Sequence, residues 1–197
     1  MNFLTVQRWY MERKHRLYTR LVRGGFGAMG KECTVQATMR CWNPRDIFLG
    51  DHVFIGADAW IDCFTEIAGQ RYEPRLEIGD GTTIGYHSHI MCVGKMKIGK
   101  KVLIADKVYI SDNLHSFEDV RTPIVDQPLS HKPVEIGDDV WLGENVCVLP
   151  GVTIGARSVI GSNSVVTRSI PSLSVAAGIP AKVIRRFNPD TGQWMRL

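Results

Sequence analysis

A histidine at the border of a regular repeat is the first candidate for chemistry in this sequence. His115 lies in the segment ISDNLHSFED, where a repeating pattern ends and an irregular stretch begins. Imidazole has a pKa of about 6.5 and accepts a proton near neutral pH, so an anchored, partly open histidine predicts a general base. A loop histidine without a task is the alternative. Asp112, Asn113 and Glu118 lie close enough to orient the ring, and the sequence does not choose among them.

Two further histidines suggest a second possibility, a zinc site. His87 and His89, in GYHSHI, lie on a segment that would stack near His115 if the repeat continues undisturbed. This arrangement suggests the three-histidine zinc site of the β-helix carbonic anhydrases, which are zinc hydratases. Such a site needs three converging ligands and an open position. The sequence lacks an evident third partner, so we expect no metal ligands.

A six-residue repeat must position these side chains, and it is clearest over residues 134–166. A period of six does not stay on one face of a helix of 3.6 residues per turn, but it does stay on one face of a strand. Gly, Asn and Asp between the apolar positions mark turns, so the pattern predicts a β-helix of stacked short strands. The large aliphatic residues of this stretch are Ile136, Leu142, Val148, Ile154, Ile160 and Val166.

The repeat extends back with interruptions to residue 49. Residues 68–75 and 116–133 do not fit it, and the longer segment contains three prolines. Both segments predict extruded loops, which on a rigid scaffold are usual places for binding and catalysis.

The two ends of the chain have other patterns. Residues 1–25 predict a basic helix, with six Arg or Lys against the single Glu12. This helix either caps the open end of the β-helix or rests on anionic lipid. Residues 26–180 form the expected β-helix domain. Residues 181–197 predict a short helix, starting after Pro180 and ending at Phe187, and a tail in which Trp194 packs back on it.

Composition excludes several classes of protein. The 197 residues are 44% hydrophobic and 22% charged, as in soluble globular proteins, and no apolar run is long enough to span a membrane. The five cysteines form no CxxC pair, which indicates a reducing cytosol. The net charge of +4 is concentrated in the N-terminal segment, and we expect no nucleic-acid partner. There is no GxSxG, GxxxxGK[ST] or HExxH motif.

Residues 134–187 resemble the hexapeptide-repeat acyltransferases nearly throughout, with weaker similarity back to about residue 49. The runs VWLGENV and AGIPAKVIRRFNPDTGQW are most similar to O-acetyltransferases of lipopolysaccharide and exopolysaccharide gene clusters. The resemblance implies an all-β fold, a left-handed parallel β-helix. It also implies direct transfer of an acetyl group from acetyl-CoA to a sugar hydroxyl in cell-surface polysaccharide biosynthesis, with His115 as general base.

The resemblance further implies a homotrimer with coenzyme A bound between subunits. Glu144 stands where relatives carry Ser or Ala, so its side chain is expected to point away from the coenzyme phosphates. For the acceptor, the candidates are Asp62, Tyr86, His87 and Asn113. The coenzyme-binding positions that carry over are Trp141, Gly143, Glu144, Ser162, Thr167, Arg168, Lys182 and Arg185.

Three other functions stay open at this point. One is N-acetylation of a nucleotide-linked amino sugar, another is the zinc hydratase, and the third is a non-catalytic β-helix that serves as an assembly subunit. For the leading function we expect a cytoplasmic protein. If its acceptor is lipid-linked, residues 1–23 would hold it peripherally at the inner membrane.

Overall fold

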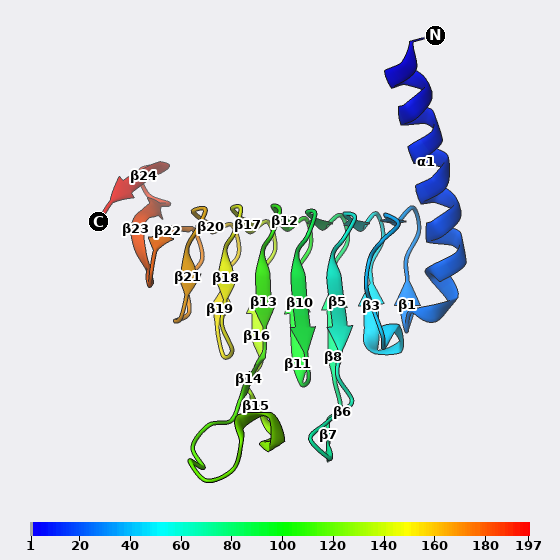
Figure 1. Ribbon diagram of the computed structural model, residues 1–197. Coiled ribbons are helices and arrows are strands. Elements are labelled where there is room, and N and C mark those ends of the chain that lie inside the picture. Colours follow the sequence, from blue (N-terminus) through cyan, green and yellow to red (C-terminus); the bar gives the residue numbers. More distant parts are fainter. Residues whose placement is uncertain (1) are drawn as a thin grey trace.

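Three sheets form the three faces of a triangular rod in the computed structural model, which describes residues 2–197 (Figure 1). The chain passes from face A to face B to face C in each coil, so each face gains one parallel strand per coil. Face A contains, in spatial order, β1 (Ala28–Met29), β3 (Ile47–Leu49), β8 (Arg75–Ile78), β11 (Lys95–Ile98), β16 (Val134–Ile136) and β19 (Thr153–Ile154).

The other two faces are built in the same way. Face C contains β5 (Trp60–Cys63), β10 (His89–Cys92), β13 (Tyr109–Ser111), β18 (Cys147–Val148) and β21 (Val165–Val166). Face B contains β2 (Thr34–Val35), β4 (Phe54–Ile55), β9 (Thr83–Ile84), β12 (Leu103–Ile104), β17 (Trp141–Leu142), β20 (Val159–Ile160), β22 (Ser174–Gly178), β23 (Ala181–Asn188) and β24 (Gln193–Arg196).

The aliphatic residues of the repeat stack in register inside the rod. On face B, Ile84 pairs with Ile104 and Ile104 pairs with Leu142, and all three are fully buried. The six-residue period is therefore confirmed: the large aliphatic residue of each unit is buried, and so is the smaller residue two positions before it, as with Val140 and Leu142. Because each coil covers the apolar residues of its neighbour, the ladders merge into one continuous core.

Left-handed backbone conformations turn the chain at the corners. Between faces B and C, φ is +58° at Asp58, +56° at His87 and +58° at Asn145. Asn and Asp tolerate this region better than other non-glycine residues, which explains their recurrence between the aliphatic positions. His87 is thus a corner residue of the rod.

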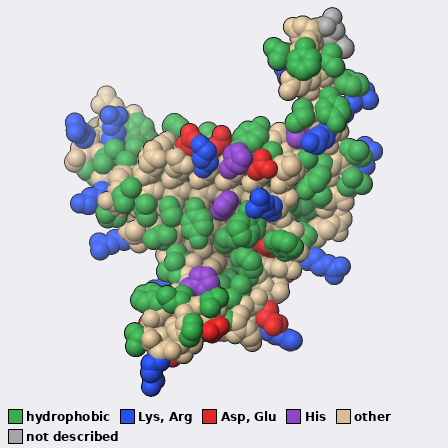
Figure 2. Space-filling view, viewed as in Figure 1, with side chains coloured by type: hydrophobic (Ala, Val, Ile, Leu, Met, Phe, Trp, Pro, Cys, Tyr) green, Lys and Arg blue, Asp and Glu red, His purple; other side chains and the backbone are tan. Residues whose placement is uncertain are grey.

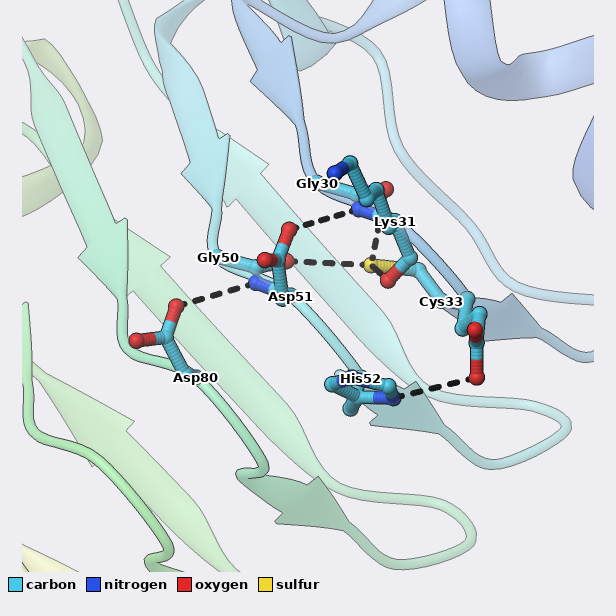
Figure 3. Close-up of polar contacts among 8 residues, drawn as sticks. Gly30, Lys31, Cys33, Gly50, Asp51, His52 and Asp80 are labelled. Carbon is cyan, nitrogen blue, oxygen red and sulfur yellow. Dashed lines mark hydrogen bonds and ion pairs between the residues drawn. The ribbon is translucent and has the colours of Figure 1, made fainter.

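Aspartates tie one coil to the next at the corner between faces A and B (Figure 3). The Asp51 carboxylate accepts the Lys31 N–H at 2.7 Å, and the Asp80 carboxylate accepts the Asp51 N–H at 3.0 Å. The second oxygen of Asp80 lies 2.9 Å from the Lys100 ammonium nitrogen. This corner is a structural ladder of backbone-to-carboxylate bonds.

The Lys100 ammonium group and the Asp51 N–H together hold the pKa of the Asp80 carboxyl below its usual value. The folded-state pKa is therefore lower than the unfolded one. The Asp80 contribution to stability is present above the unfolded pKa of about 3.9 and is lost as pH falls through the folded pKa.

Asp80→Asn keeps an oxygen for the Asp51 N–H but loses the ion pair with Lys100. We expect a small loss of unfolding free energy at pH 7, because the pair is solvated, and a flatter decline towards pH 3. Urea unfolding at both pH values measures this, and an identical pH dependence in the two proteins would contradict it.

The helix α1 (Phe3–Val22) covers the open end of the rod with its C-terminal half. The buried Thr19 hydroxyl accepts the Val35 N–H at 2.9 Å, and His15 Nδ1 accepts the Ala37 N–H at 3.2 Å. These bonds satisfy donors of the first coil, so the capping role is confirmed for this half.

The N-terminal half of α1 projects past the coils (Figure 1). No helix within residues 2–197 combines the length and apolar character needed to cross a bilayer. Single 3-10 turns lie at Arg23–Gly25, Pro44–Asp46 and Ile124–Asp126.

The helix predicted after Pro180 is wrong. Residues Ala181–Asn188 form β23, which pairs antiparallel with β22, and β24 pairs with β23 in turn. The last coil leaves an unpaired edge of face B, and hydrogen bonds to that edge outweigh the local helix signal of Pro180. The β-branched Val183 and Ile184 also suit a strand. Trp194 does pack back on this segment, edge-on to Phe187 with ring centroids 5.6 Å apart.

Both predicted interruptions leave the rod at the corner between faces C and A. The shorter one is a hairpin of β6 (Glu66–Ile67) and β7 (Gln70–Arg71). The longer one is a projecting arm, residues 113–131, whose base is a hairpin of β14 (Asn113–His115) and β15 (Leu129–His131). The expected extrusions are confirmed, and each begins as an ordered two-stranded ladder (Figure 1).

Candidate active site

His115 is the last residue of β14, at the point where the arm leaves its ladder. It pairs with Leu129 of β15, and the next residue, Ser116, donates its N–H to Pro128 at 3.1 Å. The ladder thus fixes the chain around His115, while the side chain is exposed to solvent. An anchored imidazole with open access can take a proton from a substrate hydroxyl.

The polar neighbours of His115 serve the base of the arm. Asp112 is fully buried, and its carboxylate accepts the N–H groups of Val93 at 2.9 Å and Gly94 at 2.8 Å. The side-chain amide of Asn113 donates to Asp112 and to the carbonyl of Met91. These bonds fix the exit of the arm from face C.

Within residues 2–197, none of the expected orienting residues hydrogen-bonds the His115 ring. Asp112 and Asn113 are engaged as described, and Glu118 accepts the Phe117 N–H at 3.0 Å. The position of His115 therefore depends on its backbone and on the strand opposite.

The expected coenzyme-binding residues fall into two groups on different parts of the rod. Trp141 is half exposed on the outside of face B, between Leu103 and Val159. The corner between faces B and C, and the end of face B beyond it, carry the other members of this group: Gly143, Glu144, Ser162, Lys182 and Arg185.

The second group shares its corner with the arm. Thr167 and Arg168 follow β21 at the corner between faces C and A, and both are exposed. His115 leaves the rod at this same corner, two coils earlier. A single chain therefore does not bring His115 together with Trp141 and Glu144.

The Glu144 side chain is engaged along its own corner. Its carboxylate lies 2.9 Å from the ammonium nitrogen of Lys107, and this contact raises the pKa of Lys107. The Gly143 N–H donates to Ile160 at 2.9 Å. Among residues 2–197, the Glu144 N–H has no hydrogen-bond acceptor, so it is open to a bound group.

The acceptor candidates are also divided. Asp62 is fully buried, and its carboxylate accepts the N–H groups of Asn43 and Cys63 at 3.1 and 2.9 Å. It therefore holds the first coil and makes no contact with solvent. Tyr86 and His87 are exposed at the corner between faces B and C. Tyr86 lines a cleft of about 630 Å³ between this corner and α1.

The histidines do not converge. His89 is on face C, edge-on to Trp60 at 5.6 Å, whereas His87 is at a corner and His115 is on the arm. Across the part of the chain that the structure describes, no group of three or more His, Cys, Asp or Glu side chains could hold a metal ion. The hydratase hypothesis thus has no ligand set here.

One contact that the sequence does not predict joins the two extrusions. Tyr72, which follows the short hairpin, is buried against Val93 and Leu129. Its hydroxyl accepts the Leu129 N–H at 2.7 Å and donates to the Leu129 carbonyl at 3.3 Å. The signal for it is weak, a single tyrosine in the polar stretch QRYEPR.

Residues 133–168 match the family model described as bacterial transferase hexapeptide (six repeats). The chain is also 43% identical over 159 residues to the putative lipopolysaccharide biosynthesis O-acetyl transferase WbbJ of Escherichia coli, covering 77% of this chain and 78% of that protein. This chain belongs to the hexapeptide-repeat acyltransferases. The three-faced rod is the left-handed β-helix of that family.

Other family members extend the similarity. The probable acetyltransferase Rv3034c of Mycobacterium tuberculosis is 35% identical over 183 residues, which cover 90% of this chain but only 57% of that longer protein. The hexapeptide-repeat acetyltransferase VCA0836 of Vibrio cholerae, solved in complex with acetyl coenzyme A, is 30% identical. Its TM-score is 0.56, and the match covers 88% of this chain and 78% of that one.

Proposed function

We propose that this protein transfers an acetyl group from acetyl-CoA to a sugar hydroxyl in cell-surface polysaccharide biosynthesis. The observation that carries the proposal is the placement of His115, whose backbone is fixed while its imidazole is open to solvent. The similarity to WbbJ supports a hydroxyl of a surface polysaccharide precursor as the acceptor.

The proposed reaction is a direct transfer. The His115 imidazole removes the proton from the sugar hydroxyl as that oxygen attacks the thioester carbonyl. The tetrahedral intermediate collapses with loss of the coenzyme A thiolate, which takes the proton back from the imidazolium. The open N–H of Glu144 is the proposed donor to the oxyanion, because the Gly143 N–H is already engaged.

The site is proposed to form between two subunits of a trimer. His115 and Arg168 would come from one subunit, and Trp141 with the Glu144 N–H from its neighbour. Arg168, Lys182 and Arg185 would bind the coenzyme phosphates as charge-assisted donors.

The character of the three faces supports this assembly. Face A presents Glu77, Lys97 and Glu135 to solvent in one cross-strand row. Faces B and C instead present mostly apolar rows, and such exposed rows are typical of subunit contacts (face C is the one turned to the viewer in Figure 2). Each row contains one polar member, Thr83 on face B and His89 on face C. On face B the row is Phe54, Thr83, Leu103, Trp141 and Val159, and on face C it is Trp60, His89, Tyr109, Cys147 and Val165.

A screen of nucleotide sugars and sugar oligomers with acetyl-CoA, read by mass spectrometry, tests the proposed function. A gain of one acetyl group on a sugar that lacks an amine supports it. Modification of amino sugars alone would favour N-acetylation. Failure to bind acetyl-CoA in calorimetry would favour a non-catalytic assembly subunit.

The proposed function includes peripheral contact of α1 with an anionic membrane that carries the acceptor. Cationic side chains, among them Arg13, Arg16 and Arg20, surround an apolar stripe, as in helices that lie in a lipid interface. The stripe repeats at intervals of seven, seven and four residues, so it follows one side of the helix. Its members are 57–78% exposed, and they are Phe3, Tyr10, Leu17 and Leu21.

Leu17→Glu should therefore weaken binding to vesicles that contain anionic lipid. A carboxylate at this position adds repulsion and removes apolar contact. Sedimentation with vesicles at low salt measures the bound fraction, and Val120→Glu on the exposed arm is the matched control. Equal binding of Leu17→Glu and the control would leave capping as the whole role of α1.

A further inference from the structure

We propose that Tyr72 is a positioning residue for His115, an inference that rests on the proposed role of His115 as the general base. The two residues lie on different extrusions of the rod. The link between them is Leu129, which pairs with His115 across the arm ladder and is held by the Tyr72 hydroxyl on its other side.

The ladder geometry explains why Leu129 needs this partner. In an antiparallel pair, residues alternate between those that exchange hydrogen bonds and those whose polar groups point away from the partner strand. The Ser116 N–H donates to Pro128, whereas the Leu129 N–H and carbonyl both meet Tyr72. Leu129 therefore belongs to the second kind, and its outer edge would be unpaired without the tyrosine.

Both partners of the Tyr72–Leu129 contact are buried. Tyr72 is 7% exposed and Leu129 is 6% exposed, and both pack against Val93, which is 1% exposed. Water does not readily replace a lost bond at such a site, so both backbone groups of Leu129 depend on one phenol oxygen. Because neither Asp112 nor Asn113 bonds the His115 ring, the strand opposite is the main constraint on its position.

The short hairpin of β6 and β7 places the Tyr72 side chain against the base of the arm. Its base is closed by the Tyr72 N–H, which donates to Thr65 at 2.9 Å, so the hairpin delivers the phenol to the foot of the arm. A small displacement of the arm would move the His115 imidazole away from a thioester held by the neighbouring subunit. Such misplacement lowers the rate of the chemical step more than substrate binding.

The test compares Tyr72→Phe with Val93→Ala in the full-length trimer. Tyr72→Phe keeps the ring and removes only the two hydrogen bonds. Val93→Ala removes buried methyl groups from the same cluster and leaves both bonds intact. We expect Tyr72→Phe to lower kcat about tenfold with an unchanged KM for acetyl-CoA, while Val93→Ala lowers the melting temperature but keeps kcat. Proton exchange of the Leu129 amide should also be faster in Tyr72→Phe alone.

Two results would overturn the positioning role. One is full kcat in Tyr72→Phe while His115→Ala is inactive, which leaves the proposed function intact. The other is a Leu129 amide equally protected in Tyr72→Phe and in the wild type. Full activity of His115→Ala would instead overturn the proposed function, and the positioning role with it.

Discussion

His115→Ala should lower the rate of acetyl transfer by about 10²- to 10⁴-fold, the usual contribution of a positioned general base. The alanine removes the group that takes the proton from the acceptor hydroxyl, and the neighbouring polar side chains do not replace it. Asp112 is buried and bonded to backbone N–H groups, and Glu118 is bonded to its own loop. Release of thiol from acetyl-CoA in the presence of the acceptor measures the rate.

The loss should be confined to catalysis. His115 is exposed, and its replacement removes no core contact, so the melting temperature and the proposed trimer should be unchanged. His52→Ala is a suitable control, because His52 is another exposed histidine, at the corner between faces A and B, 3.4 Å from Glu32. It should retain the full rate. Unchanged turnover in His115→Ala would remove this residue from the proposed mechanism.

The rod itself follows from local sequence, because every coil repeats the same physical problem. Each face must bury its large aliphatic residue, and one residue per corner must turn the chain. Ile104, Leu142 and Asn145 meet these needs within single six-residue units, so the period alone predicts their places.

The C-terminal segment shows where local patterns stop being sufficient. Residues 181–188 follow Pro180, and their charged residues are Lys182, Arg185 and Arg186, a local pattern that does not exclude a helix. The deciding factor is the free edge of β22, which exists only after the whole rod has formed. Tertiary pairing thus overrides the local preference.

The candidate site also contains one part that the sequence predicts and another that depends on tertiary contacts. The end of the repeat near residue 115 marks the arm, and so the place of His115 at the base of the arm could be predicted from the sequence. The Tyr72–Leu129 contact spans 57 positions between two irregular segments, and no period links them. The burial of Asp62 also depends on a distant segment, since its partners at residues 42 and 43 belong to the preceding coil.

Leu103→Glu should separate the subunits of the proposed trimer and abolish activity. Leu103 is 49% exposed at the centre of face B, with Trp141 on one side and Thr83 on the other. A carboxylate in the middle of an apolar contact loses the burial of the leucine and is left without a partner. Because the side chain points outward, the core of the rod is untouched, and each chain should keep its circular dichroism spectrum.

Loss of activity in this variant follows from the division of the site within one chain. His115 leaves the rod between faces C and A, whereas Trp141 and the Glu144 N–H lie on and beside face B. A folded monomer would hold the base without the proposed oxyanion donor. We therefore expect the acetyl transfer rate to fall about a hundredfold or more, together with a shift to monomer in light scattering.

Thr153→Glu is the matched control, because it adds the same charge to the polar face A beside Glu135. It should remain trimeric and active, since this face is proposed to stay in solvent. A mixture of the His115→Ala and Lys182→Glu variants provides a second test of the shared site. If each site draws on two subunits, mixed trimers regain sites in which both residues are intact, and activity returns. A Leu103→Glu monomer with the wild-type rate would show that one chain holds a complete site, which would contradict the shared arrangement.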